Sequence, residues 1–123
     1  MSDSPFVWHD LTVPNADPVR DFYSAVLGWQ AQEIEMDGYA DYAMVPPGAE
    51  TAAGGVCWAR GENQGLPAQW LMYVMVPNLT EAIERVQANG GKLIQGPRMM
   101  GDQGFACIQD PAGAHLAIMG PVS

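Results

Sequence analysis

Basic residues are scarce in this chain. It has five Lys and Arg residues against fourteen Asp and Glu residues, which gives a formal net charge of −9 at pH 7. Nucleic-acid binding depends on Lys and Arg side chains that neutralise phosphates, so the composition disfavours nucleic acid as a partner. The acidic residues are scattered along the chain. They predict a self-repelling surface, with a cationic ligand as the alternative.

Long hydrophobic runs are also missing. No apolar stretch approaches the roughly 20 residues that a membrane helix needs. The opening segment Met1–Phe6 has neither the basic region nor the apolar region of a secretory signal peptide. We therefore expect a cytoplasmic protein that has no membrane partner.

The chain has two cysteines, Cys57 and Cys107, and neither lies in a CxxC pair. Both occur in apolar, strand-like runs, which favours buried free thiols. A disulfide between them is the alternative, although it is less common in cytoplasmic proteins.

What the sequence does contain is a repeat. Val13–Gly28 recurs as Val76–Gly91 under one constant offset. Repeats are sought first because missing one misassigns the whole fold. The first copy carries five residues that the second copy repeats: Val13, Pro14, Asn15, Ala25 and Gly28, which match Val76, Pro77, Asn78, Ala88 and Gly91.

Each copy predicts a helix with one apolar stripe. Asp17 is expected to cap the first helix, with Pro18 in its first turn and Gly28 after its end. Asn78 or Thr80 is expected to cap the second. Apolar residues recur at i, i+3, i+4 and i+7 in both copies, at Val19, Phe22, Tyr23 and Val26 and at Leu79, Ala82, Ile83 and Val86.

The two copies give two tandem βαβββ modules, at about residues 5–60 and 70–120, with a linker at about 61–69. We expect helices at Asp17–Leu27 and Thr80–Asn89, with Asp37-Gly38 as a hairpin turn. A loop is expected at Gly96–Gly104. The expected strands are Phe6–Val13, Trp29–Met36, Tyr39–Val45, Ala52–Ala59, Leu71–Val76, Lys92–Gln95, Phe105–Gln109 and His115–Met119.

Alternation along the strands predicts which side chains face away from the helices. The helix-facing set is Leu11, Val13, Val74, Val76, Leu116 and Ile118. The opposite face then collects aromatic and polar residues, which is typical of a pocket lining. Its members are Trp8, Asp10, Thr12, Leu71, Tyr73, Met75, His115, Ala117 and Met119.

The paired modules, with FYSAVLGW after the first strand and DPAGAHLAI near the end, resemble the vicinal oxygen chelate superfamily. This group includes glyoxalase I, extradiol dioxygenases and bleomycin-resistance proteins. The resemblance covers nearly the whole chain. It implies an α+β protein whose curved mixed sheet surrounds a cavity, with helices on the convex face, and a homodimer.

The resemblance also implies a divalent metal held by His or Glu, but this chain departs from that pattern. The ligand positions fall on Trp8, Leu71, Ala117 and the segment Gly55–Ala59, none of which supplies His or Glu. His9 lies beside the first position, but alternation turns it to the helix side. We therefore expect no metal and no other cofactor, because Asp10 and His115 alone make a poor ion site.

The predicted function is metal-independent binding of a small organic molecule in the sheet cavity, as in the bleomycin-resistance branch. Trp8 either stacks on the ligand or fills space, and Asp10 either anchors a cation or is a solvated carboxylate at the pocket rim. Tyr73 either anchors the ligand through its hydroxyl or is a core residue whose hydroxyl meets water. Thr12, Met75, Met100 and His115 complete the expected lining, with Met99 and Met119 as further candidates. The alternative is a lyase, isomerase or dioxygenase, which would use Asp10 and His115 as acid and base or a metal on displaced ligands.

Overall fold

The computed structural model describes residues 4–122 and has the element order β-α-β-β-β twice. It divides into two compact units. The first unit runs from His9 to Trp70, and the second joins the start of the chain, up to Trp8, to the segment from Leu71 onward. Residues 1–3, part of the segment Met1–Phe6 in which we expect no signal peptide, lie outside the described residues. Within the described residues, neither helix is long and apolar enough to cross a bilayer.

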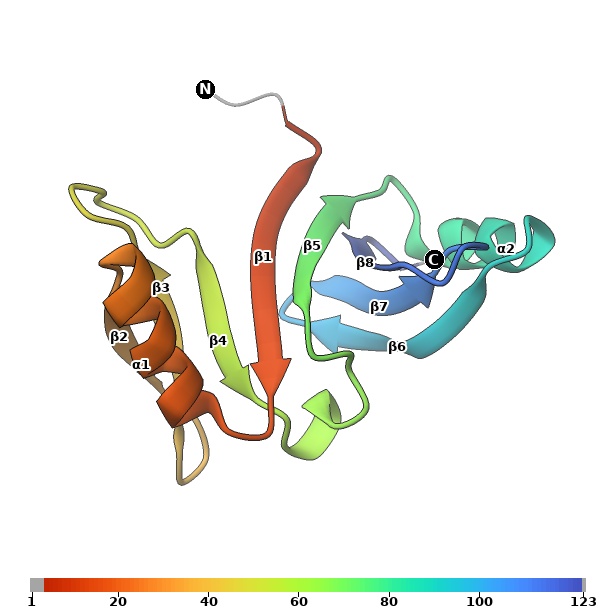
Figure 1. The fold of residues 1–123 in the computed structure, drawn as a ribbon. Coiled ribbons are helices and arrows are strands. Elements are labelled where there is room, and N and C mark those ends of the chain that lie inside the picture. The colour runs from red at the N-terminus through yellow and green to blue at the C-terminus, as the bar shows by residue number, and fades with distance from the viewer. Residues whose placement is uncertain (1–3, 123) are drawn as a thin grey trace. The chain divides into compact units, whose positions relative to one another are not determined.

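The first unit contains a four-stranded sheet and one helix (Figure 1). Its elements are β1 (Phe6–Val13), α1 (Ala16–Leu27), β2 (Gln30–Glu35), β3 (Ala40–Val45) and β4 (Gly54–Trp58). The strand order is β2-β3-β4-β1, with β1 parallel to β4 and the other pairs antiparallel. β1 matches the expected strand at both ends.

The core of the first unit lies between α1 and one face of this sheet. Leu11 and Val13 of β1 pack there with Met44 and Val56, both of which are fully buried. Burying a side chain of this size contributes about 1.5–3 kcal/mol. The prediction that Leu11 and Val13 face the helix is confirmed.

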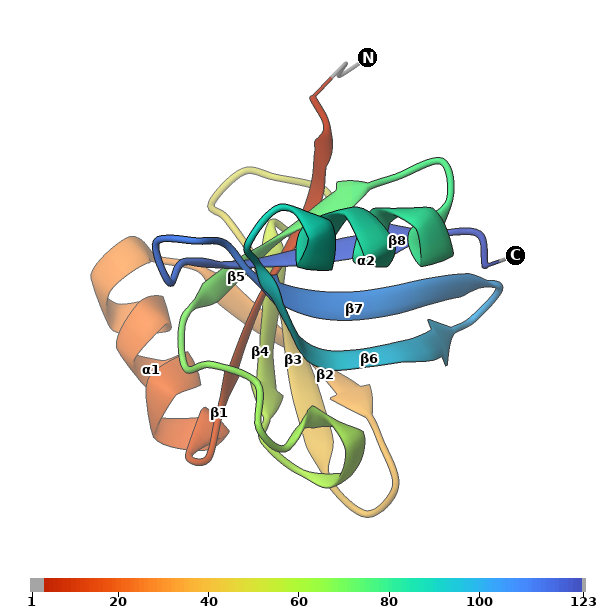
Figure 2. The ribbon, with the colours of Figure 1, turned by 90° about the vertical axis from the view of Figure 1, so that its right-hand side faces the viewer.

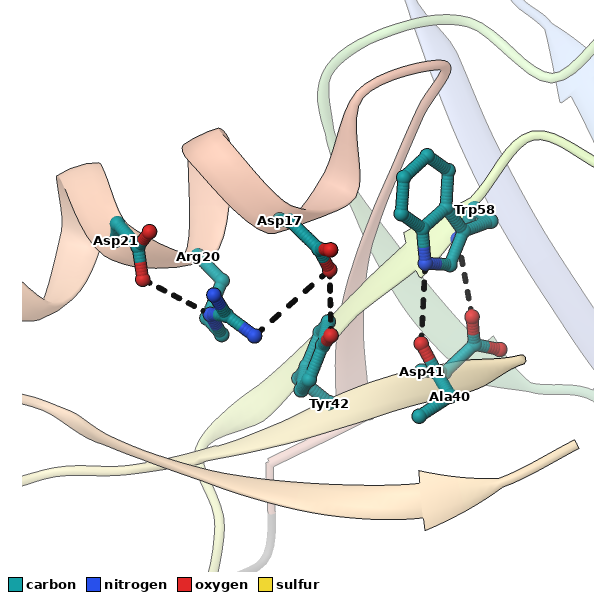
Figure 3. Close-up of polar contacts among 7 residues, drawn as sticks. All are labelled: Asp17, Arg20, Asp21, Ala40, Asp41, Tyr42 and Trp58. Carbon is teal, nitrogen blue, oxygen red and sulfur yellow. Dashed lines mark hydrogen bonds and ion pairs between the residues drawn. The ribbon is translucent and has the colours of Figure 1, made fainter.

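The start of α1 corrects one prediction. Asn15 is the N-cap residue, its side chain makes no capping hydrogen bond, and Asp17 lies inside the first turn. The Asp17 carboxylate instead accepts a hydrogen bond from the Tyr42 hydroxyl and pairs with Arg20 at 3.7 Å (Figure 3). A negative charge in the first turn still favours the helix dipole. Gly28 ends the helix with a φ of 72°, as expected.

The second unit has the same plan. Its elements are β5 (Trp70–Met75), α2 (Leu79–Ala88), β6 (Lys92–Met100), β7 (Gln103–Gln109) and β8 (His115–Gly120), in the strand order β5-β8-β7-β6. Figure 2 shows α2 lying across this sheet, where it packs on β6, β7 and β8. Leu79, Ala106 and Ile118 form the core. The α+β class and the two βαβββ modules are confirmed.

Two segments differ from expectation. The expected linker contains a short 3-10 helix, Gly61–Asn63. The expected loop Gly96–Gly104 is wrong, because β6 runs through to Met100 and only a tight turn separates it from β7. The pairing of β6 with β7 shifts in register between Leu93 and Arg98. The Gly96-Pro97 pair lies at this irregularity, so the strand continues past the proline.

The two N-cap asparagines give a matched test of the fold. The Asn78 side chain accepts a hydrogen bond from the Glu81 N–H at 3.0 Å, whereas Asn15 makes no such bond. We predict that Asn78→Ala lowers the free energy of unfolding by about 1 kcal/mol. Asn15→Ala should cost less, and urea unfolding of the two variants measures the difference. Equal losses would contradict the capping assignment.

Candidate functional site

The sheet face opposite α1 carries Asp10 and Thr12. Because successive strand residues point to opposite faces, these two alternate with Leu11 and Val13, which face the helix. In the parallel ladder Asp10 is paired with Gly55 and Thr12 with Cys57. The structure therefore brings Asp10, Thr12 and Cys57 together on one face of the first unit.

Two glycines make the approach of β4 to β1 possible. A Cβ added at Gly55 would lie 2.4 Å from the Asp10 carboxylate oxygen, and one added at Gly54 would lie 2.4 Å from the His9 carbonyl oxygen. At Gly54 the clash would be with backbone, so this glycine permits the close approach of the two strands. At Gly55 a side chain would displace the Asp10 carboxylate, so Gly55 leaves the space that this carboxylate occupies.

Asp41 of β3 joins this face, and sequence reasoning did not select it. The residue is only 6% exposed. One carboxylate oxygen accepts the Trp58 backbone N–H at 3.0 Å (Figure 3), and the Cys57 thiol also donates to it. Burial raises the pKa of Asp41, although these two hydrogen bonds oppose the rise.

Both cysteines are free thiols, so the disulfide alternative is wrong. Cys107 is buried, as predicted, whereas Cys57 is only half-buried. Burial raises the pKa of Cys57, and the negative charges of Asp10 and Asp41 raise it further. Burial also raises the pKa of Cys107 to about 11. Both thiols therefore stay protonated at neutral pH and are poor nucleophiles.

In the second unit, the face opposite α2 carries three of the expected site residues. Tyr73 is paired with Ala117, Met75 with Met119, and His115 with Gln109. Leu116 and Ile118 pack against α2, as predicted. This confirms that Tyr73, Met75 and His115 share a face.

A stack of three side chains lies on that face. The Tyr73 and Phe105 ring centroids are 5.5 Å apart, and the Arg98 guanidinium carbon lies 4.9 Å from the Phe105 centroid. Arg98 was missed because its segment was expected to be a loop. A cation over an aromatic ring is a favourable contact of about 0.5–1 kcal/mol at exposed sites.

The remaining expected residues are placed as follows. Trp8 is half-buried in β1 and, like Met100, belongs to the second unit, whereas Asp10 and Thr12 belong to the first. Met100 is paired with Gln103 at the end of β6 and is 39% exposed, so the loop that was to carry Met99 and Met100 inward does not exist. A joint site containing both Asp10 and His115 stays a prediction.

The side chains at the superfamily's ligand positions do not fit a divalent metal. Leu71 and Ala117 are buried and carry no donor atom, and the indole of Trp8 has only an N–H. Within residues 4–122, no three His, Cys, Asp or Glu side chains converge to hold an ion. Asp10 and Asp41 share their face with the Cys57 thiol, which stays protonated at neutral pH.

The comparisons with known proteins agree with this fold. A model of the Glyoxalase/Bleomycin resistance protein/Dioxygenase superfamily matches residues 6–118, and the chain belongs to this superfamily. A superfamily member of known structure from Vibrio splendidus 12B01 superposes with a TM-score of 0.58 at 15% identity, covering 91% of this chain and 95% of that one.

Two curated relatives are similar to this chain in sequence. "Anthracycline biosynthesis protein DnrV" of Streptomyces peucetius is 28% identical over 123 residues, with 90% of this chain and 45% of that protein covered. "Putative glyoxylase CFP32" of Mycobacterium tuberculosis is 26% identical over 113 residues, with 90% and 43% covered. The chain thus spans less than half the length of these relatives.

The pKa of Asp41 predicts a dependence of stability on pH. The folded-state pKa lies above the ordinary value of 3.8, so between these two values the folded protein holds a proton that the unfolded chain has released. The contribution of Asp41 to the free energy of unfolding is therefore fully present below pH 3.8. It is lost as the pH rises through the folded-state pKa, because the folded protein must then bury a charged carboxylate.

We predict that Asp41→Asn removes this loss, since the amide is never charged and keeps an oxygen for the Trp58 N–H. The free energy of unfolding of the variant, relative to the original protein, should rise from below pH 3.8 to neutral pH. Asp37→Asn, in an exposed turn, is the control. Parallel pH profiles for the original protein and Asp41→Asn would contradict the assignment.

Proposed function

We propose that this protein binds a small organic cation without a metal, at the face of the first unit that carries Asp10 and Asp41. One observation carries the proposal: the pairing of β3, β4 and β1 places the Asp10 and Asp41 carboxylates on the same sheet face, on either side of β4. Three of the superfamily's metal positions, at Trp8, Leu71 and Ala117, in contrast carry no side chain that binds a divalent metal. A fixed negative site of this kind is suited to an organic ammonium group.

The two carboxylates have different roles in this proposal. Asp10 is half-buried and provides the charge that the ligand meets first. Asp41 is buried, and its carboxylate is held in place by the Trp58 N–H. A cation next to Asp41 favours its ionised form, so binding and deprotonation are linked. Affinity should therefore increase as pH rises through the raised pKa of Asp41.

The names of two relatives support a planar cation as the ligand. DnrV and the Streptomyces sp. protein "Anthracycline biosynthesis protein DauV", which is 27% identical, are both named for anthracycline biosynthesis. Anthracyclines with an amino sugar join a flat ring system to a group that is protonated at neutral pH. The net charge of −9 would also favour the approach of such a molecule.

The first test uses an anthracycline with a free amino sugar and its N-acetyl derivative, which has the same rings but no positive charge. We predict that fluorescence titration gives at least about tenfold tighter binding of the amine, in line with one charge-assisted hydrogen bond. Asp10→Asn should abolish this difference, and Asp37→Asn should preserve it. Equal affinity of the original protein for both compounds would refute the cation site.

The second test addresses the metal. Untagged protein, purified without chelator and dialysed against Mn, Fe, Ni and Zn, should retain less than about a tenth of an equivalent by plasma mass spectrometry. Close to one equivalent, lost in Asp10→Asn or His115→Gln, would instead support the metal-dependent alternative.

The proposal also includes a homodimer in the cytoplasm. The dimer is an expectation from the superfamily, and sedimentation at several concentrations tests it. Trp8, Tyr73, Met75, Met100 and His115 belong to the second unit and stay predictions as ligand-binding residues, and the cation site proposed for the first unit does not include them.

A further inference from the structure

The first unit contains a hollow on the helix side of its sheet, the side opposite to Asp10 and Asp41. It has a volume of about 340 Å³ and is lined by His9, Trp29, Ala53 and Trp70, which we call the aromatic pocket. Trp29 and Trp70 pack against the core between α1 and the sheet. Because His9 and Asp10 are consecutive residues of β1, their side chains point to opposite faces. The aromatic pocket is therefore separate from the Asp10 and Asp41 face.

The indole walls of the pocket are held in fixed orientations. The Trp70 indole N–H donates to the Tyr23 hydroxyl at 3.0 Å, and the Tyr23 ring meets Trp70 edge-on at 5.3 Å. The Trp29 and Trp70 rings are 6.2 Å apart at 77°. Neither indole is fully buried, so both retain surface for a ligand. A ligand that meets them does not have to immobilise them, which reduces the entropic cost of binding.

His9 gives the pocket one defined polar group. Its Nδ1 lies 3.3 Å from the Ala53 carbonyl oxygen. A carbonyl oxygen can only accept, so Nδ1 carries the hydrogen in this contact. In the neutral ring, Nε2 is then the acceptor. Among the described residues 4–122, neither a carboxylate nor a Lys or Arg side chain lines the pocket.

We propose that the aromatic pocket binds an uncharged, planar bicyclic heteroaromatic molecule with one N–H or O–H donor. Its rings would pack on Trp29 and Trp70, and its donor would bond to Nε2 of His9. The volume lies at the small end of the usual range for ligand pockets, roughly 300–1,000 Å³, which suits two fused rings. The absence of a charged lining residue disfavours an ion, whose desolvation would not be compensated. This inference does not depend on the cation site.

Indole and 1-methylindole are the probes, because they differ chiefly in the N–H donor. Binding is measured by titration of 15N-labelled protein, followed by backbone amide shifts. We predict saturable binding of indole, with shifts around Ala53 and Trp70, and about fivefold weaker binding of 1-methylindole, as one hydrogen bond provides. His9→Phe keeps a ring but removes both nitrogens, so it should give the two probes equal affinity. His9 is exposed, and the variant is expected to fold.

Filling the pocket is the second part of the test. Ala53→Leu places a larger side chain in the lining and should weaken both probes roughly tenfold or more, since the ligand loses its contact volume. Ala49→Leu makes the same change in an exposed loop and is the control. Asp10→Asn should leave indole binding unchanged, which separates this site from the cation site. No saturable binding at millimolar indole, or binding unaffected by Ala53→Leu, would overturn the proposal.

Discussion

The burial of one helix stripe against one face of a four-stranded sheet is the constraint on which the rest of each unit depends. Leu11, Val13 and Val56 meet α1, and Ala106 and Ile118 meet α2. Because strand side chains alternate, this burial assigns the intervening residues to the opposite face without any further interaction. Polar residues such as Asp10, Asp41 and His115 are thus presented by strands whose other side chains provide the stability.

The acidic face of the first unit is closely packed. Gly55 is the residue that leaves room for the Asp10 carboxylate, and Asp41 is anchored by the backbone of the neighbouring strand. A buried carboxyl of this kind costs stability when it ionises. The fold tolerates this loss of stability because the core on the helix side does not include Asp41. In the proposed function, the buried carboxylate provides a fixed negative charge for a ligand without a metal.

Local signals predicted much of the fold. The alternation in Phe6–Val13 gave β1 and its two faces, and Asn78 caps α2 as one of the two expected residues. The failures involve distant partners. Asp17 bonds to Tyr42, which lies on another element, and β6 continues past Pro97 because its pairing with β7 tolerates a shift in register.

The candidate sites were predicted less fully than the fold, for the same reason. Asp10 and Thr12 followed from alternation, but Asp41 depends on the order of β3, β4 and β1 in the sheet. The aromatic pocket draws on β1, the segment between α1 and β2, the residue that precedes β4 and the start of β5. No periodicity in the sequence connects those four positions. Arg98 became visible only once its segment was known to be a strand.

The position of His9 next to Asp10 has a consequence for how this chain can change. A shift of β1 by one residue would turn Asp10 towards the helix and His9 towards the carboxylates, because every side chain of a strand changes face together. Single-residue insertions or deletions within β1 would therefore alter both proposed sites and the core in one event. Either site can therefore change by substitution but not by a change in the length of β1. The core, the cation site and the aromatic pocket all depend on that length.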